Sequence, residues 1–133
     1  MKRLVLFAFA AAGLAACKKG NPLTPYLFGK WEVTRVYGGN IYPPDSIYKA
    51  GNGNIMQFNA DSTFERYTNG KLVYQGIFHT RKNGFNNGQS SYDVIWFDAD
   101  TSFKSVLLLN RQVLTIKPLI PDISTTDYDK ISD

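Results

Sequence analysis

The chain has 133 residues, of which 15 are Lys or Arg, 11 are Asp or Glu, one is His and one is Cys. A single Cys cannot form an intrachain disulfide, and together with a single His it cannot build a Cys/His zinc cluster. An apolar share of 44% with 20% charged residues is typical of one folded domain. The formal charge of +4 would suit an acidic partner such as nucleic acid, so the position of the basic residues matters.

The N-terminal segment combines a basic start with a short apolar run. Lys2 and Arg3 precede residues 4–16, which carry no polar side chain and are too few for a membrane span of about 20 residues. This pattern is typical of a secretory signal peptide. The residues Leu14-Ala15-Ala16-Cys17 resemble the lipobox of bacterial lipoproteins. The resemblance implies cleavage before Cys17 and attachment of lipid, such as palmitate, to that residue.

This resemblance divides the chain into a signal peptide over 1–16, a lipidated Cys with a short tether over 17–26, and a folded domain over 27–133. The tether is polar and contains Gly and Pro, and eight such residues reach at most about 26 Å. The resemblance also implies an outer-membrane anchor facing the periplasm, because Lys18 is not the Asp that retains such proteins in the inner membrane. A secreted protein with a free or buried Cys17 is the alternative.

Beyond Tyr26 the sequence shows strand alternation with short turns, and no window keeps apolar residues at helical spacing for more than one turn. Asn69-Gly70 is the strongest hairpin signal, because both residues tolerate the positive φ of a type I′ turn. The eight expected strands contain Lys30 to Tyr37, Met56 and Phe58, Phe64, Leu72 to His79, Tyr92 to Trp96, Phe103 to Leu109, Val113 to Lys117 and Tyr128 to Ser132, with 81–90 as a loop. Closing them into an all-β, eight-stranded antiparallel up-and-down barrel removes exposed edges. A two-layer sandwich is the alternative.

The segment Leu27-Phe28-Gly29-Lys30-Trp31 resembles the Gly-x-Trp signature in the first strand of lipocalins. The resemblance is closest to the small lipocalin-like lipoproteins of bacterial envelopes. It implies a lipocalin-like barrel with Trp31 at the closed base and a cationic side chain from the last strand over its ring. Lys130 is the candidate for that cation.

Alternation also predicts which side chains face the barrel interior. Seven of them carry large rings, which predicts a mostly filled interior in which Gly76 leaves some space. The rings belong to Trp31, Phe58, Phe64, Tyr74, Phe78, Tyr92 and Trp96, and the smaller inward residues are Val33, Met56, Val94, Leu107, Leu109, Leu114 and Ile116. The loops 38–54 and 118–127 share the rim away from the termini and carry apolar residues, which indicates either a recognition surface or a hydrophobic lid. The ligand-binding candidates are Tyr42, Tyr48, Tyr74, Phe78, Tyr92, Leu119 and Ile120.

Catalytic chemistry is not predicted. His79 falls on the strand face opposite Tyr74 and Phe78, so it is expected to face solvent without a nucleophile beside it. The run 98–102 opens like a calcium loop but lacks the Gly and the late Glu of such loops, so it is expected to be a hairpin turn. We therefore predict no enzyme activity, no metal site and no cofactor.

Two functions remain open. One is a lipid-anchored barrel that binds a small apolar or amphipathic molecule at the rim distal to the membrane, and the alternative is a filled barrel that serves as a structural or protein-interaction module of the cell envelope. Four basic residues, at positions 2, 3, 18 and 19, precede the domain, and the remaining eleven match the eleven acids. Because the domain is neutral, no nucleic-acid partner is predicted. The expected partners are the membrane, through the N-terminal lipid, and a small hydrophobic ligand or an envelope protein.

Overall fold

The computed structural model describes residues 24–40 and 45–133. The signal peptide, Cys17 and Tyr42 lie outside the described residues. One short helix, α1, precedes nine strands. Their bounds are α1 Thr24–Leu27, β1 Gly29–Tyr37, β2 Asp45–Ile47, β3 Ile55–Phe58, β4 Thr63–Thr68, β5 Lys71–Asn86, β6 Ser91–Phe97, β7 Ser105–Leu109, β8 Val113–Pro118 and β9 Thr125–Ser132.

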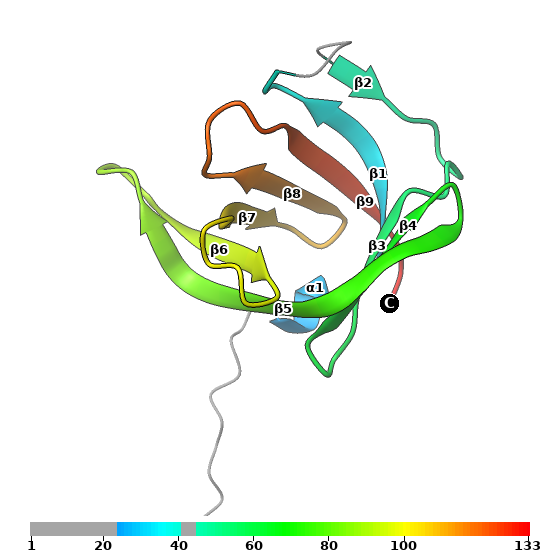
Figure 1. The fold of residues 1–133 in the computed structure, drawn as a ribbon, viewed down its shortest axis with the longest axis horizontal. Helices are drawn as coiled ribbons and strands as arrows, with labels where there is room; N and C mark the ends of the chain where they lie inside the picture. The colour runs from blue at the N-terminus through cyan, green and yellow to red at the C-terminus, as the bar shows by residue number, and fades with distance from the viewer. Residues whose placement is uncertain (1–23, 41–44) are drawn as a thin grey trace, which may run out of the picture.

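The sheet is a closed antiparallel barrel, as the sequence predicts. Strands β3 to β8 each pair with the next strand in the chain, and β1 closes the ring by pairing with β3 on one side and with β9 on the other. Figure 1 shows β1 beside β9, with the C-terminus and α1 at one end of the barrel. The expected type I′ turn is present, since Asn69 and Gly70 have φ of 50° and 76°. The alternative of a two-layer sandwich is therefore wrong.

Two elements depart from the expected strand list. The short strand β2 pairs with the last residues of β1, where Arg35 and Asp45 form an ion pair at 2.6 Å. Strand β5 has 16 residues and includes much of the segment expected to be a loop at 81–90. A bulge between Arg81 and Phe85 interrupts the pairing of β5 with β6, and Asn83 takes a φ of 51° there. The bulge hides the strand alternation from sequence reading.

The core fills the end of the barrel that carries α1, which we call the base. Leu27 and Trp31 are fully buried, and the Trp31 indole N–H donates to the Leu27 carbonyl at 2.7 Å. The ammonium of Lys130 lies 5.5 Å from the centre of the Trp31 ring, which is the contact that the lipocalin resemblance implied. Gly29 has a φ of 114°, and a Cβ there would collide with the Ser132 carbonyl, so both backbone conformation and space demand glycine. No helix in the described part of the chain has the length and apolar character needed to cross a membrane.

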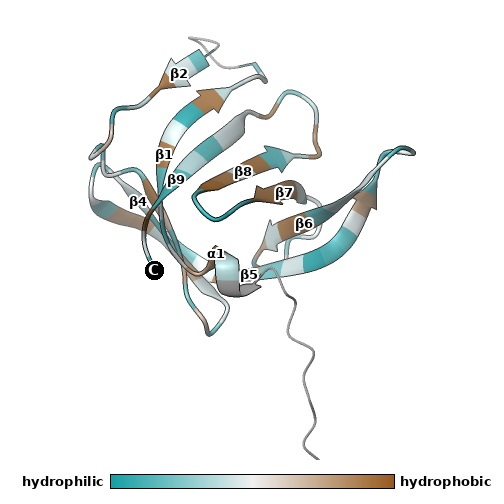
Figure 2. Cartoon of the chain, turned by 180° about the vertical axis from the view of Figure 1, so that it is seen from behind, coloured by the Kyte–Doolittle hydropathy of each residue, from teal (hydrophilic) through white to brown (hydrophobic). Residues whose placement is uncertain are grey.

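The inward face of β6 differs from the prediction by one residue. Ile95 and Phe97 join the core, whereas Tyr92 and Trp96 do not: Tyr92 stacks on Phe85, and Trp96 stacks on His79. Val94 is buried, but it packs against Gly84 of the neighbouring strand rather than in the core cluster. Figure 2 shows why strand faces are hard to distinguish in this part of the sheet, since the next strand, β7, is hydrophobic along almost its whole length.

Candidate ligand-binding site

The end of the barrel opposite α1, which we call the mouth, is hollow. Its larger cavity has a volume of about 510 Å³ and lies between β3, β4, β5, β6 and the loop that follows β6. We call this cavity the large compartment. It is lined by Met56, Phe64, Arg66, Tyr74, Phe97, Asp98, Ala99, Asp100 and Phe103. Tyr92 and Trp96, two of the seven rings expected in the interior, are absent from the core, so fewer of these rings fill the barrel than expected.

Aromatic rings form the floor and one wall of the large compartment. The Phe64 ring packs on Phe97 with centroids 4.6 Å apart and on Tyr74 with centroids 5.7 Å apart. Beneath them the Phe58 ring meets Phe78 edge-on at 5.0 Å. Phe78, a predicted ligand contact, is only 3% exposed and belongs to this core floor, so it supports the compartment without lining it.

A bonded carboxylate closes the rim of the large compartment between β5 and the end of β6. Asp98 accepts hydrogen bonds from the Tyr74 hydroxyl at 2.5 Å and from the Ile77 N–H at 3.0 Å, and its own N–H donates to the Ile77 carbonyl at 2.8 Å. The carboxylate occupies the space above Gly76, where a Cβ would collide with it. The sequence predicted that Gly76 leaves some space in the interior, and the Asp98 carboxylate occupies this space.

The hydrogen bond between Tyr74 and Asp98 shifts the titration of both groups. Donation of this bond stabilises the carboxylate, so the pKa of Asp98 is lowered, with the Ile77 N–H adding to the effect. The same bond and the negative charge beside it raise the pKa of Tyr74. At neutral pH the site therefore holds a neutral phenol donating to an ionised carboxylate.

A smaller cavity of about 260 Å³ adjoins the mouth on the other side of Arg66, and we call it the small compartment. It shares Met56 and Arg66 with the large compartment and includes Tyr48, one of the predicted contacts. Its remaining lining residues are Val33, Val36, Asn54, Ile55, Tyr67, Thr68, Thr126 and Tyr128. Tyr128 is buried at the inner end, and burial raises its pKa to about 12. The small compartment is thus apolar at its inner end.

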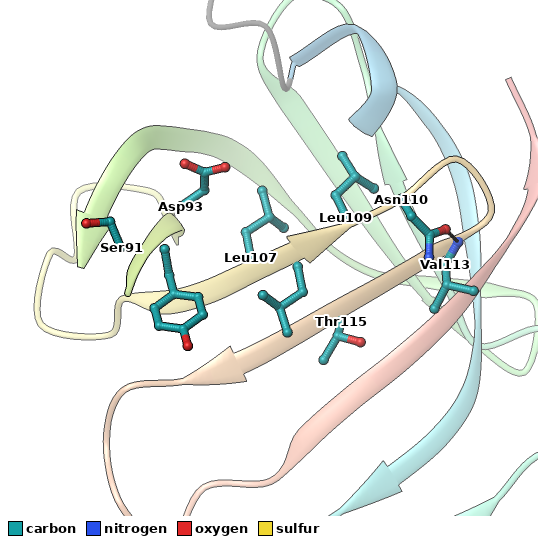
Figure 3. Close-up of a pocket in the computed structure, with 9 residues that line it drawn as sticks. Ser91, Asp93, Leu107, Leu109, Asn110, Val113 and Thr115 are labelled. Atoms are coloured by element: carbon teal, nitrogen blue, oxygen red, sulfur yellow. Dashed lines mark hydrogen bonds between the residues drawn. The ribbon is translucent and has the colours of Figure 1, made fainter. Parts of the chain in front are cut away.

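The other predicted contacts lie elsewhere. Leu119 and Ile120 are half-buried in the loop between β8 and β9, where the Leu119 N–H donates to the Lys104 carbonyl, and neither residue lines a compartment of the mouth. Tyr92 lines a separate hollow of about 380 Å³ beside the line where β6 and β7 stop pairing. Figure 3 shows this hollow, with Asp93 on β6, Leu107 and Leu109 on β7, and Thr115 on β8.

Sequence reasoning missed most of the groups that give the mouth its chemistry. It placed Phe64 inside the barrel but did not extend the alternation to Arg66, two residues later on the same strand. In the register of the sheet Arg66 stands opposite Met56 on β3 and Tyr74 on β5, so it shares their inward face. A basic residue at an inward position was the available signal. Asp98 had none, because its role depends on the loop after β6 reaching β5.

Neither a metal-ligand cluster nor the single His adds to the chemistry of the mouth in the part of the chain that the structure describes. The described residues contain no group of three or more His, Cys, Asp or Glu side chains that could hold a metal ion. His79 is exposed, as predicted, and stacks on Trp96 at 5.2 Å. Comparison with known proteins adds no assignment: no family model, no curated protein and no solved structure matches the chain.

Proposed function

We propose that the protein binds a small apolar or amphipathic molecule in the mouth of its barrel. The observation that carries this proposal is the large compartment, whose volume of about 510 Å³ exceeds the roughly 300 Å³ at which ligand pockets begin. Its walls combine aromatic rings with a few polar groups, which is the composition of small-molecule sites. The proposed activity is binding, with no catalytic step.

We further propose that the chain is a lipocalin-like lipoprotein, anchored through Cys17 to the outer membrane and facing the periplasm. The lipobox-like residues before Cys17 and the Gly29-x-Trp31 pair support this assignment. The chain enters the domain at α1, which lies at the base. A tether of about eight residues from a lipidated Cys17 would therefore hold the base towards the membrane and turn the mouth away from it.

A neutral fluorescent probe, anilinonaphthalene, tests the binding proposal, because its emission rises on transfer from water to an apolar site. It should bind the full chain carrying Cys17→Ser, a background that carries no lipid on residue 17. Ala99→Trp places a large side chain at the rim of the large compartment and should weaken binding about tenfold or more. Ala60→Trp, in the β3–β4 turn at the base, is the matched control and should leave binding unchanged. No binding by the parent chain would contradict the proposal.

The anchor is tested separately by metabolic labelling with a radioactive fatty acid in a Gram-negative host. The parent chain should be labelled, and Cys17→Ser should abolish the label because no other cysteine is present. Label persisting in the variant would refute the assignment of Cys17 as the lipidated residue.

A second candidate function is protein interaction at the mouth end. Ile47, at the end of β2, is 82% exposed, and Ile123, in the connection between β8 and β9, is 42% exposed; both lie at that end of the barrel. These side chains do not form the hydrophobic lid that was one expectation for the loops. If the neutral probe fails to bind, this second candidate is favoured, and Ile47→Asp should then abolish capture of an envelope protein by the purified domain.

A further inference from the structure

We propose that the molecule bound in the mouth carries a single negative charge, which pairs with Arg66, on an apolar body that fills the large compartment. The inference rests on the proposed function and names the chemical class of its ligand. The class is a monoanionic amphiphile, with a carboxylate or sulfonate group as the head.

The position of Arg66 is the first support. It lies on the inward face of β4, between Met56 and Tyr74 in the sheet register, and it lines both compartments. Its guanidinium carbon lies 5.9 Å from the centre of the Tyr74 ring. The charge acts on both sides of the mouth, because it opposes the rise in pKa of Tyr74 in one compartment and of Tyr128 in the other. A ligand entering either compartment therefore meets this cation.

The second support is that Arg66 has no acidic partner among the described residues. The ion pairs within 4 Å in this part of the chain join Arg35 to Asp45 and Lys130 to Asp133. Asp98 shares the large compartment with Arg66, but its oxygens already accept from Tyr74 and Ile77. A guanidinium offers five N–H donors in a planar fork that matches a carboxylate or sulfonate. Arg66 is thus available for an anionic group of a ligand.

The size and charge of the surroundings restrict the ligand further. At about 30 Å³ for each water-sized group, a cavity of about 510 Å³ holds roughly 17 heavy atoms. Asp98 and Asp100 line the same compartment, so a second negative charge on the ligand would meet two carboxylates. The aromatic wall of Phe64, Phe97 and Tyr74 suits a hydrocarbon or ring body. Polyanions and strongly polar ligands do not fit this arrangement.

The test compares two probes that share one apolar body, neutral anilinonaphthalene and its sulfonate, on the full chain carrying Cys17→Ser. Arg66→Met keeps an apolar stem but removes the charge. It should raise the Kd of the sulfonate about tenfold or more and change the Kd of the neutral probe less than about twofold. Arg81→Met, an exposed residue on the far half of β5, is the matched control and should change neither Kd.

The outcomes distinguish a failure of the anionic-head inference from a failure of the proposed binding function. If Arg66→Met changes the Kd of both probes equally, or of neither, the inference of an anionic head is overturned. The proposed function still stands in that case, provided that the parent chain binds the neutral probe. Failure of the parent chain to bind either probe would overturn both. If Arg66→Met does not fold, Arg66→Lys and a salt series replace it. The lysine variant should retain the sulfonate preference, and high salt should weaken only sulfonate binding, so a salt-insensitive sulfonate Kd would overturn the inference.

Discussion

At the scale of single residues, Gly76 is explained by a side chain 22 positions away in the sequence. It stands on the inward face of β5 opposite Phe64, where a larger residue would normally add to the core. The Asp98 carboxylate fills the space instead and joins the loop after β6 to the Tyr74 hydroxyl and the Ile77 N–H. The φ of Gly76 is not positive, so backbone conformation does not demand glycine here. Glycine is required because the Asp98 carboxylate approaches its Cα closely.

The substitution Gly76→Ala should therefore destabilise the protein by displacing Asp98. Adding a methyl group to an occupied space costs about 1–3 kcal/mol. In the background of Asp98→Gly, which removes the carboxylate and suits the φ of 52° at that position, the same substitution should cost less than half as much. Urea unfolding of the parent, both single variants and the double variant measures the coupling. Additive effects in this cycle would show that Asp98 does not occupy the space above Gly76.

The residues that sequence reasoning placed correctly are those defined by a local pattern. The exposure of His79 is of this kind, since strand alternation is sufficient to predict it. The contact of Lys130 with Trp31 was instead implied by the resemblance of the first strand to that of lipocalins. Like His79, Arg66 could have been found from strand alternation. The role of Asp98 could not be predicted, because it depends on the path of a loop in three dimensions and no local pattern encodes that path.

At the scale of elements, the connection between β2 and β3 is held by one buried carboxylate. Glu32 on β1 is only 6% exposed, because this connection covers it. Its two oxygens accept from the Gly51 N–H at 2.8 Å and the Gly53 N–H at 2.9 Å. Each glycine has a positive φ, which turns its N–H towards β1. The carboxylate thus holds the middle of the connection, whose two ends are bonded to β1 through the Tyr48 N–H and the Asn54 carbonyl.

Replacing Glu32 with Gln should release this connection, because the amide nitrogen of Gln would face one of the two N–H donors. A buried donor left without an acceptor costs about 1–3 kcal/mol of unfolding free energy. Hydrogen exchange should also accelerate at Gly51 and Gly53. Glu65→Gln is the matched control: Glu65 is half-buried and, among the described residues, accepts a side-chain hydrogen bond from the Tyr67 hydroxyl alone, so its loss should cost less than about 0.5 kcal/mol. Similar losses in the two variants would contradict the proposed role of Glu32.

The strand β6 shows why whole elements can be assigned to the wrong face. Its sequence from Tyr92 to Phe97 is apolar at most positions, so either set of alternate residues could face inward. Trp96 is accommodated outside the core by stacking on His79 and by the Lys104 ammonium 5.3 Å from its ring centre. A shift of one residue exchanges every side chain between the two faces. The bulge at Asn83 and its effect on β5 were equally hidden in the sequence.

At the scale of the whole molecule, the barrel was predictable but its cavity was not. Strand number and turn spacing favour closure, because eight short strands leave exposed edges in any open sheet. The volume of the mouth depends on where the large side chains point and on how the loops close. With Tyr92 and Trp96 outside the core, fewer rings fill the interior, and the large compartment remains between Phe64, Phe97 and Tyr74. One buried residue of the interior, Tyr128, makes the stability of the barrel depend on pH.

The stability of the whole barrel should fall as the pH rises from about 10 to about 12. The pKa of Tyr128 is about 12 in the folded protein against 10.0 in the unfolded chain, because burial disfavours the phenolate. The folded state therefore holds this proton over that interval after the unfolded state has lost it, and stability present below pH 10 is lost as the pH approaches 12. The loss is on the order of 2 kcal/mol. Tyr128→Phe has no proton to lose at this position. The difference in urea-unfolding free energy between the parent and this variant should therefore change between pH 10 and pH 12. If the two free energies ran parallel over that interval, the burial of an ionisable phenol would be contradicted.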